Sequence, residues 1–196
     1  SYYDFYVAIW DLYRASIYQL DLSGEIHSMY IYIDKVKYFI NSQHGIYSYR
    51  YIKDSTWMNT TSNIKVSQQW ISHYCDEGLS EENLISFVCR SDLLNRNIKK
   101  PVYISVNFLE QDIMKILEVM KITPNTIVYL IDKSNGVMAA ENKSELGKPL
   151  DSVIDINLHR LKHEGVKRIK INNSDYYHAL YKRNNIIDGG MVVLIP

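Results

Sequence analysis

The sequence predicts an α+β protein: a long N-terminal helix followed by two tandem modules, each built on an antiparallel sheet. Three observations predict this fold. Apolar residues recur with helical spacing over residues 2–21, short β-branched and aromatic runs separated by turn residues begin at residue 27, and helix and strand patterns alternate clearly over residues 109–195. The 196 residues are enough for two small modules that each bury a hydrophobic core.

The N-terminal helix is predicted over residues 2–21, within a first segment that we place at residues 1–24. Its apolar positions are Phe5, Ile9, Leu12 and Leu20, with small Ser16 completing the spacing. Gly24 follows and can adopt the left-handed conformation that ends many helices. Further aromatic residues lie on the other sides of this helix, so we expect other parts of the protein to cover most of it.

The first module is placed at residues 25–106. Its expected strands are 27–33, 35–41, 46–52, 84–90 and 101–107, the last two paired across a polar turn at 95–97. Asp54 is expected to cap a short helix that contains Trp57, and residues 68–75 have the pattern of a weak helix or a loop.

The second module is placed at residues 107–196, with a boundary near Asn107. An amphipathic helix is predicted over 109–121, ending before Pro124, with Ile113, Ile116 and Leu117 facing the sheet. A second, looser helix is predicted over 150–163. The expected strands are 126–133, 137–140, 166–172, 176–182 and 191–195.

Three turns are predicted between these strands. Asn135-Gly136 is typical of a hairpin in which both residues have positive φ, and a second hairpin is expected at Ser174-Asp175. Gly189-Gly190 is predicted to form a turn before the last strand.

Composition excludes several function classes. Twenty-two basic and 22 acidic residues give a net charge of zero, without the surplus of Lys and Arg that nucleic-acid binding normally requires. No window approaches the ~20 consecutive apolar residues of a transmembrane helix, and no signal-peptide pattern is visible. The abrupt start and the apolar final strand suggest an excised piece of a longer protein.

The two cysteines, Cys75 and Cys89, are too few for a disulfide scaffold. Two buried free thiols and a single bridge in an oxidising compartment both remain open from the sequence.

Aromatic residues with polar tips provide the candidate binding site. Seventeen Tyr against four Phe is unusual, because Tyr suits half-buried strands and pocket walls that face water. The candidates, all in the first module, are Tyr47, Tyr49, Tyr51, Trp57, Trp70, Tyr74 and Arg90. They suit a small polar ligand such as a sugar, or a carboxylate held by Arg90. In the alternative, the Tyr residues pack on the outer face of the sheet and Trp57 fills the core.

No catalytic constellation is recognisable in the sequence. A nucleophile elbow, a phosphate-binding loop and a dinucleotide glycine fingerprint are absent. His159 and His163 have a spacing that can bind a metal, but Arg160 stands where the zinc-protease motif needs Glu, so a solvated helix face is the preferred interpretation. We therefore expect no enzyme activity, no cofactor and no metal in this chain.

Four segments carry a resemblance to a known family. The runs PVYISVNFLEQDIMKIL, IVYLIDKSNGVMAAENKSELGKPL and YYHALYKRNNIIDGGMVVLIP resemble the membrane-proximal half of a double Cache domain, a pair of PAS-like modules in extracytoplasmic parts of bacterial sensors. The upstream run IHSMYIYIDKVKYFI, with Trp57 after it, is similar to the distal half of the version found in sensor histidine kinases.

The resemblance implies an extracytoplasmic input domain of a membrane-bound two-component sensor histidine kinase, with the kinase beyond Pro196 and a homodimeric full-length receptor. Amino-acid-binding members carry a Tyr, Arg, Trp-Tyr and Asp pattern, whereas YSYRYIKDSTWMN has no Trp-Tyr pair. A module that recognises a solute-binding protein, without a small-molecule pocket, and the ligand-binding domain of a chemoreceptor are the alternatives.

Overall fold

The predicted α+β fold is confirmed in a computed structural model of the chain. The structure describes residues 2–52, 54–76, 81–91, 101–164, 166–171, 175–184 and 189–196. The chain forms two compact units, Ser1–Leu109 and Glu110–Pro196, each with its own antiparallel sheet. The turns predicted at 95–97 and at Ser174 fall on residues outside these ranges.

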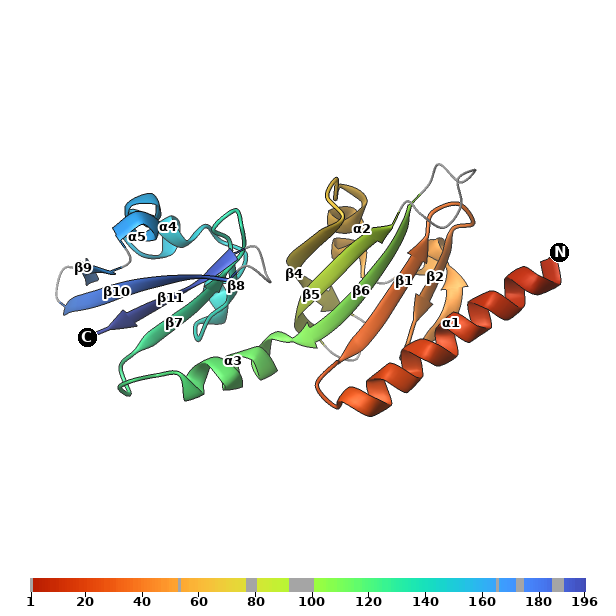
Figure 1. The fold of residues 1–196 in the computed structure, drawn as a ribbon, viewed down its shortest axis with the longest axis horizontal. Coiled ribbons are helices and arrows are strands. Elements are labelled where there is room, and N and C mark those ends of the chain that lie inside the picture. The colour runs from red at the N-terminus through yellow and green to blue at the C-terminus, as the bar shows by residue number, and fades with distance from the viewer. Residues whose placement is uncertain are drawn as a thin grey trace. The chain divides into compact units, whose positions relative to one another are not determined.

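The first unit contains a six-stranded antiparallel sheet in the order β3-β2-β1-β6-β5-β4 (Figure 1). Its strands are β1 (Ser28–Ile33), β2 (Tyr38–Asn41), β3 (Gly45–Ser48), β4 (Gln68–Asp76), β5 (Glu81–Ser91) and β6 (Val102–Leu109). Its helices are α1 (Tyr2–Ser23), the 3-10 turn η1 (Tyr49–Tyr51) and α2 (Ser55–Ser62).

The N-terminal helix α1 packs on one face of this sheet through a narrow stripe. Ile9 is 2% exposed and lies in a cluster with Ile31, Ile40 and Val102. At its C-terminal end, Gly24 has a φ of +59° and its backbone N–H donates to Leu20 O at 3.3 Å, as predicted for a glycine cap.

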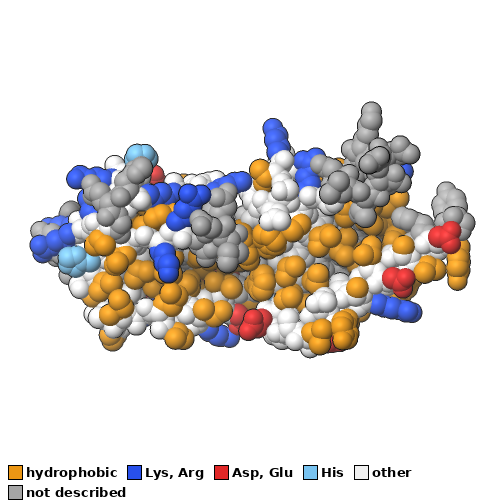
Figure 2. Space-filling view, viewed as in Figure 1, with side chains coloured by type: hydrophobic (Ala, Val, Ile, Leu, Met, Phe, Trp, Pro, Cys, Tyr) orange, Lys and Arg blue, Asp and Glu red, His pale blue; other side chains and the backbone are white. Residues whose placement is uncertain are grey.

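The expectation that α1 is covered on most sides is not met within this unit. Apolar side chains are exposed along the helix (Figure 2), and among its described side chains those at least half exposed are Tyr3, Tyr6, Trp10, Tyr18 and Leu22. Leu12 is 40% exposed. The reason is geometric: a straight helix on a sheet presents only one stripe to it, and here that stripe includes Ile9 and Ser16, which are both buried.

The opposite face of the sheet packs against α2. Trp57 is fully buried there, and its ring contacts those of Tyr30 and Phe39 at centroid distances of 5.5 and 5.4 Å. The predicted cap of α2 is confirmed, because Asp54 Oδ1 accepts from the backbone N–H of Trp57 at 2.8 Å. Successive side chains of a strand point to opposite faces of the sheet. Each apolar run of the sequence therefore contributes residues to the face beneath α1 and to the face beneath α2.

Sequence predictions for three segments of this unit were wrong. Residues 68–75 form strand β4, not a helix or loop, because they pair along their whole length with β5. The predicted strand 46–52 stops at Ser48 and continues as η1. The short strand β2 begins only at Tyr38 because Lys37, with a φ of +58°, completes the preceding turn.

The second unit contains a five-stranded antiparallel sheet in the order β8-β7-β11-β10-β9. Its strands are β7 (Ile127–Ile131), β8 (Val137–Ala139), β9 (Val166–Ile171), β10 (Asp175–Asn184) and β11 (Gly189–Ile195). Its helices are α3 (Glu110–Val119), the 3-10 turn η2 (Lys143–Glu145), α4 (Leu150–Val153) and α5 (Leu158–Glu164).

Helix α3 is rotated relative to the prediction. Met114 and Leu117 are buried, while Ile116, predicted to face the sheet, is 61% exposed. The buried carboxylate of Glu110 explains the rotation, because it accepts from the backbone N–H of Ala140 and from Lys143 Nζ. This anchor puts positions 110, 114 and 117, which share one helix face, on the inside.

The predicted helix over 150–163 is two short helices, α4 and α5, with an extended segment between them. Ile154 and Ile156 are buried in that segment while Asp155 is exposed. Buried and exposed residues alternate here one by one, which is the pattern of extended backbone and not of a helix. The prediction of a single helix was therefore wrong.

The glycine turns also differ from the prediction. Asn135 has a φ of +69°, but Gly136 does not have positive φ, because Asp132 Oδ1 accepts from the backbone N–H groups of both Ser134 and Gly136 and sets a longer turn. Gly189 and Gly190 lie inside β11 and not in a turn. A Cβ on Gly189 would lie 2.1 Å from Ile131 O, so the close approach of β7 requires glycine there.

The two cysteines are separate in the first unit. Cys75 lies opposite Glu82 and Cys89 opposite Gln68, so seven residues separate them along the β4–β5 pair. At a rise of ~3.3 Å per residue that is about 23 Å, far beyond the reach of a disulfide. Burial raises the pKa of the Cys89 thiol, which lowers its thiolate fraction at neutral pH.

We predict two free thiols per chain. The protein purified without reductant and then denatured should react with two equivalents of Ellman's reagent, and reduction beforehand should not change that number. The native protein should react slowly, because Cys75 is buried and the pKa of the Cys89 thiol is raised. Fewer than two thiols in the denatured monomer would contradict the β4–β5 register.

We also predict that Ile9→Asp destabilises the chain more than Leu12→Asp. The first change places a carboxylate in the cluster beneath α1 and should lower the free energy of unfolding by about 3 kcal/mol. The second change lies on the exposed side and should cost within about 1 kcal/mol. Urea denaturation followed by circular dichroism measures the free energy of unfolding of both variants. Equal losses in the two variants would show that the buried stripe of α1 is not where we place it.

Candidate functional site

The candidate site begins where α2 meets strand β4 in the first unit. Asp54, the cap of α2, is 2% exposed, and its second oxygen, Oδ2, lies 2.9 Å from His73 Nδ1 on β4. The His73 side chain has no exposed surface. The contact has the distance of an ion pair, although its angle is outside the range of an aligned hydrogen bond.

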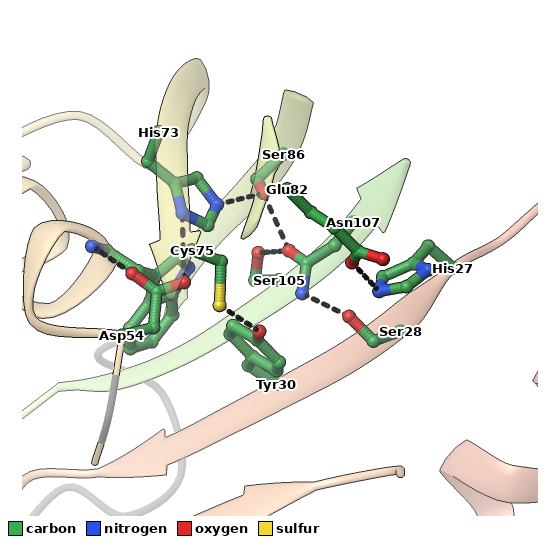
Figure 3. A network of polar contacts seen from close by, with 11 residues as sticks. His27, Ser28, Tyr30, Asp54, His73, Cys75, Glu82, Ser86, Ser105 and Asn107 are labelled. Atoms are coloured by element: carbon green, nitrogen blue, oxygen red, sulfur yellow. Dashed lines mark hydrogen bonds and ion pairs between the residues drawn. The ribbon is translucent and has the colours of Figure 1, made fainter. Parts of the chain in front are cut away.

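From His73 a chain of hydrogen bonds crosses the sheet (Figure 3). His73 Nε2 lies 2.8 Å from Ser86 Oγ, and the Ser86 hydroxyl donates to Asn107 Oδ1 at 2.7 Å. The Ser105 hydroxyl donates to the same oxygen at 2.6 Å, and Asn107 Nδ2 donates to Ser28 Oγ at 2.9 Å. The network thus joins α2 to β4, β5, β6 and β1.

Strand register explains why these side chains meet. Ser86 lies opposite Asn107, and Asn107 lies opposite Ser28, so the three side chains project from the same face in adjacent strands. Ser105 is two residues from Asn107 and shares that face. All four are 1% exposed or less, which places a continuous polar stripe inside an otherwise apolar interior.

Two further contacts flank the stripe in Figure 3. Tyr30 Oη lies 3.9 Å from Cys75 Sγ, and His27 Nε2 lies 3.0 Å from Glu82 Oε2. The His27 and Glu82 side chains are 19% and 30% exposed, so this pair lies nearer the solvent than the His73 pair.

Helix α2 carries two buried polar atoms without a hydrogen-bond partner among the residues that the structure describes. They are Trp57 Nε1 and Thr61 Oγ1, on residues that are 0% and 1% exposed. A separation of four residues puts both on one face of α2. An indole N–H only donates, while a hydroxyl donates and accepts, so this face suits a polar molecule that carries hydrogen-bond acceptors.

Three of the predicted binding residues lie on this face. Trp57 is in the core cluster, and Tyr47 packs against it, with its ring 5.4 Å from that of Phe39. Arg90 lies opposite Tyr103 of the same cluster, and its Nη1 donates to Ile64 O at 3.0 Å, just beyond α2. The structure therefore brings Tyr47, Trp57 and Arg90 to the side of the sheet that α2 covers.

The other four predicted residues lie elsewhere. Tyr49 and Tyr51 are in η1, where they are 38% and 72% exposed, and Lys37 Nζ lies 5.4 Å from the centre of the Tyr49 ring. Trp70 and Tyr74 alternate with His73 along β4 and so project from the opposite face. Trp70 packs there against Phe87, at a ring distance of 5.1 Å.

Sequence reasoning missed His73, Ser86 and Asn107 as members of a site. Because residues 68–75 were predicted as a helix or loop, the face on which His73 projects was unknown. A usable signal was present in Ser105 and Asn107, two small polar residues at alternating positions of a strand that is otherwise apolar and aromatic. Such residues on a buried face need partners on neighbouring strands.

Neither a metal centre nor a membrane span is found in the described part of the chain. No group of three or more potential ligands from His, Cys, Asp and Glu is close enough to hold a metal ion there. None of the described helices is long and apolar enough to cross a membrane. His159 is exposed, as expected for a solvated helix face, and the His163 side chain is outside the described set.

Comparison with known proteins places this fold among sensors. No protein-family model matches the chain, and no curated protein matches it. Among solved structures, the extracellular domain of mmHK1S-Z2, a protein assigned as a histidine kinase, is similar with a TM-score of 0.62 and 12% identity. The match covers 96% of this chain and 81% of that one.

Chemoreceptor domains share the fold as well. The ligand-binding domain of PctB from Pseudomonas aeruginosa, solved with L-Gln, has a TM-score of 0.61 and 10% identity, over 89% of this chain and 69% of that one. The sensory domain of Tlp3 from Campylobacter jejuni, solved with isoleucine, has a TM-score of 0.53 and 16% identity, over 95% and 71%. The chain therefore has the fold of extracellular sensor domains, which confirms the fold that the double Cache resemblance implies.

We predict that the polar stripe depends on Asn107. Asn107→Ala leaves the hydroxyls of Ser86, Ser105 and Ser28 buried without their partner, and should lower the free energy of unfolding by about 3 kcal/mol. Asn59→Ala, on the exposed side of α2, is the matched control and should change it by less than about 0.5 kcal/mol. Urea titrations of both variants test this, and a tolerated Asn107→Ala would mean that the network contributes little.

Proposed function

We propose that this chain is the extracytoplasmic ligand-sensing input domain of a membrane-bound two-component sensor histidine kinase. It would transmit the state of its binding site across the membrane to a cytoplasmic kinase. The fold shared with the mmHK1S-Z2 extracellular domain supports this, and so does the resemblance of the sequence to double Cache domains. Neighbours such as PctB carry bound small molecules, which supports a small-molecule ligand.

The binding site is proposed in the first unit, between α2 and the sheet face that carries the polar stripe. The observation that carries this placement is the pair of buried atoms Trp57 Nε1 and Thr61 Oγ1, which have no hydrogen-bond partner among the described residues. Leaving such groups unpaired costs about 1–3 kcal/mol each, which a polar ligand would offset.

The ligand class follows from the groups on this face. Trp57 and Tyr47 offer aromatic surface, Thr61 offers a hydroxyl, and Arg90 adds a cation at the margin. A sugar would use the aromatic surface and the hydroxyl, and a small carboxylate would use the two donors of α2 and Arg90. Of the seven candidates from the sequence, Tyr49, Tyr51, Trp70 and Tyr74 are proposed to contribute less.

Two alternatives remain, one about what the domain binds and one about the kind of receptor it belongs to. A module without a small-molecule site would instead receive a solute-binding protein. A chemoreceptor input domain is favoured by the neighbours PctB and Tlp3, which share the fold. A ligand-dependent change in autophosphorylation of the full-length receptor would support the kinase, and methyl-accepting sequences beyond Pro196 would support the chemoreceptor.

We predict that a thermal-shift screen against sugars, amino acids and small carboxylates identifies a stabilising compound. A compound that binds one site and is present at 100 times its Kd raises the free energy of unfolding by about 2.7 kcal/mol. Calorimetric titration should then give a Kd that is weakened by about 3- to 10-fold in Thr61→Val, which removes one hydrogen bond and keeps the shape of the side chain. Trp57→Phe removes the indole N–H together with one ring, so its Kd should be weakened at least as much.

The matched control is Trp70→Phe. It makes the same chemical change on the opposite face of the sheet, where Trp70 packs against Phe87, and should leave Kd unchanged. Weaker binding in Trp70→Phe together with unchanged binding in Trp57→Phe would contradict a binding site next to α2. A screen without a stabilising compound would favour the module that binds a solute-binding protein.

A further inference from the structure

Charge is distributed unevenly along this neutral chain. Of its 22 basic and 22 acidic residues, seven basic and two acidic ones fall within residues 159–184, from α5 to the end of β10. This leaves 15 basic and 20 acidic residues for the rest of the chain. One part of the second unit is therefore basic although the net charge is zero, and the strand register shows where its cations lie.

The second sheet has one face that packs on helices. Ile169, Ala179, Val192 and Leu194 lie in the core cluster of the unit together with Leu161, so α5 covers this face. The residues that alternate with them along β9, β10 and β11 project from the other face. We call that other side of these three strands the outer face.

The outer face combines apolar and basic side chains. Its apolar members, half-buried apart from Val166, which is 52% exposed, are Val166, Leu180, Met191, Val193 and Ile195. Its basic members, all exposed, are Arg168, Lys170 and Lys182. None of the outer-face positions in the described parts of β9, β10 and β11 is Asp or Glu. Figure 2 shows hydrophobic side chains over the strands of the second unit, with Lys, Arg and His side chains beside them.

Two of these cations lie at the end of the sheet where β11 ends. Arg168 lies opposite His178, and His178 lies opposite Ile195, the last residue of β11. Lys170 is two residues further along β9 in the direction in which β11 runs, which is about 7 Å at ~3.3 Å per residue. Arg168 and Lys170 therefore flank the point where the chain leaves the sheet.

We propose that this end of the outer face binds the anionic headgroups of a phospholipid membrane. The proposal rests on the proposed function, in which a membrane span follows this chain, so that the end of β11 is the part of the second unit next to the lipid. Arg168 and Lys170 would donate to phosphate oxygens, and the exposed Val166 beside them would contact the interfacial region.

A second copy of the chain fits the outer face less well. Two apposed outer faces would bring Arg168, Lys170 and Lys182 of both copies into one interface, and no outer-face position of the described strands supplies Asp or Glu between them. Like charges placed together in an interface disfavour association. An anionic membrane instead presents the opposite charge over a continuous surface.

The test is cosedimentation of the chain with lipid vesicles at about 0.05 M salt. Vesicles of phosphatidylglycerol and phosphatidylcholine in equal parts should bind the chain. Vesicles of phosphatidylcholine alone should bind it at least about 10-fold more weakly, because each cation near an anionic surface strengthens binding by about fivefold. Binding to the anionic vesicles should be lost near 1 M salt, where the screening length is only about 3 Å.

Two double variants locate the surface. Arg168→Glu combined with Lys170→Glu should weaken binding to the anionic vesicles by more than about 10-fold. Lys133→Glu combined with Lys148→Glu is the matched control and should weaken it by less than about threefold. It makes the same change in charge at exposed positions of the same unit, beside the turn after β7, at the end of the sheet away from Ile195. Far-ultraviolet circular dichroism should be unchanged in both.

Four results would overturn the proposal. Three concern vesicles: no binding to anionic vesicles at low salt, equal binding to neutral and anionic vesicles, and equal losses in the two double variants. The fourth is a dimer without vesicles that dissociates in the Arg168→Glu, Lys170→Glu variant, which would assign the outer face to a second copy. The vesicle assay needs no ligand, so its failure would leave the ligand-sensing function standing, and a ligand screen without a hit would leave the lipid surface standing.

Discussion

The buried amide of Asn107 is the constraint on which the first unit depends. It has no exposed surface and bonds side chains from three strands at once, so a shift of any of these strands by one residue would leave polar groups unpaired in the interior. Apolar side chains on a sheet tolerate small shifts, whereas a fully bonded polar stripe does not. The stripe therefore fixes the register of β1, β5 and β6, and through His73 and Asp54 it also fixes the start of α2.

The two faces of the sheet in the first unit differ in composition. The face beneath α1 is aliphatic around Ile31 and Ile40, and Ile9 of the N-terminal helix packs against it. The face beneath α2 carries the polar stripe and packs with Trp57 in an aromatic cluster, and α2 itself carries two buried polar atoms, Trp57 Nε1 and Thr61 Oγ1, without a hydrogen-bond partner among the described residues.

In the second unit the buried carboxyl group of Glu110 has a comparable role. Glu110, the first residue of α3, is 2% exposed and is held by Lys143 and by the backbone N–H of Ala140. These contacts decide which face of α3 is buried, against the apolar pattern that predicts Ile116 on the inside. A buried carboxylate with partners outweighs one Ile, since moving it out would leave the Ala140 N–H without its acceptor.

The sequence alone determined the α+β class, the long first helix with its Gly24 cap, the Asp54 cap of α2 and most strands, because these depend on local periodicity and local hydrogen bonds. Of the binding residues proposed from the sequence, Tyr47, Trp57 and Arg90 lie on the α2 side of the sheet, and their role in binding stays a prediction. Only the tertiary structure decided that residues 68–76 are a strand, that Trp70 and Tyr74 face away from α2, and that His73 meets Asp54. The physical reason is that strand pairing joins residues distant in the chain, and a register difference of one residue reverses the face on which every side chain lies.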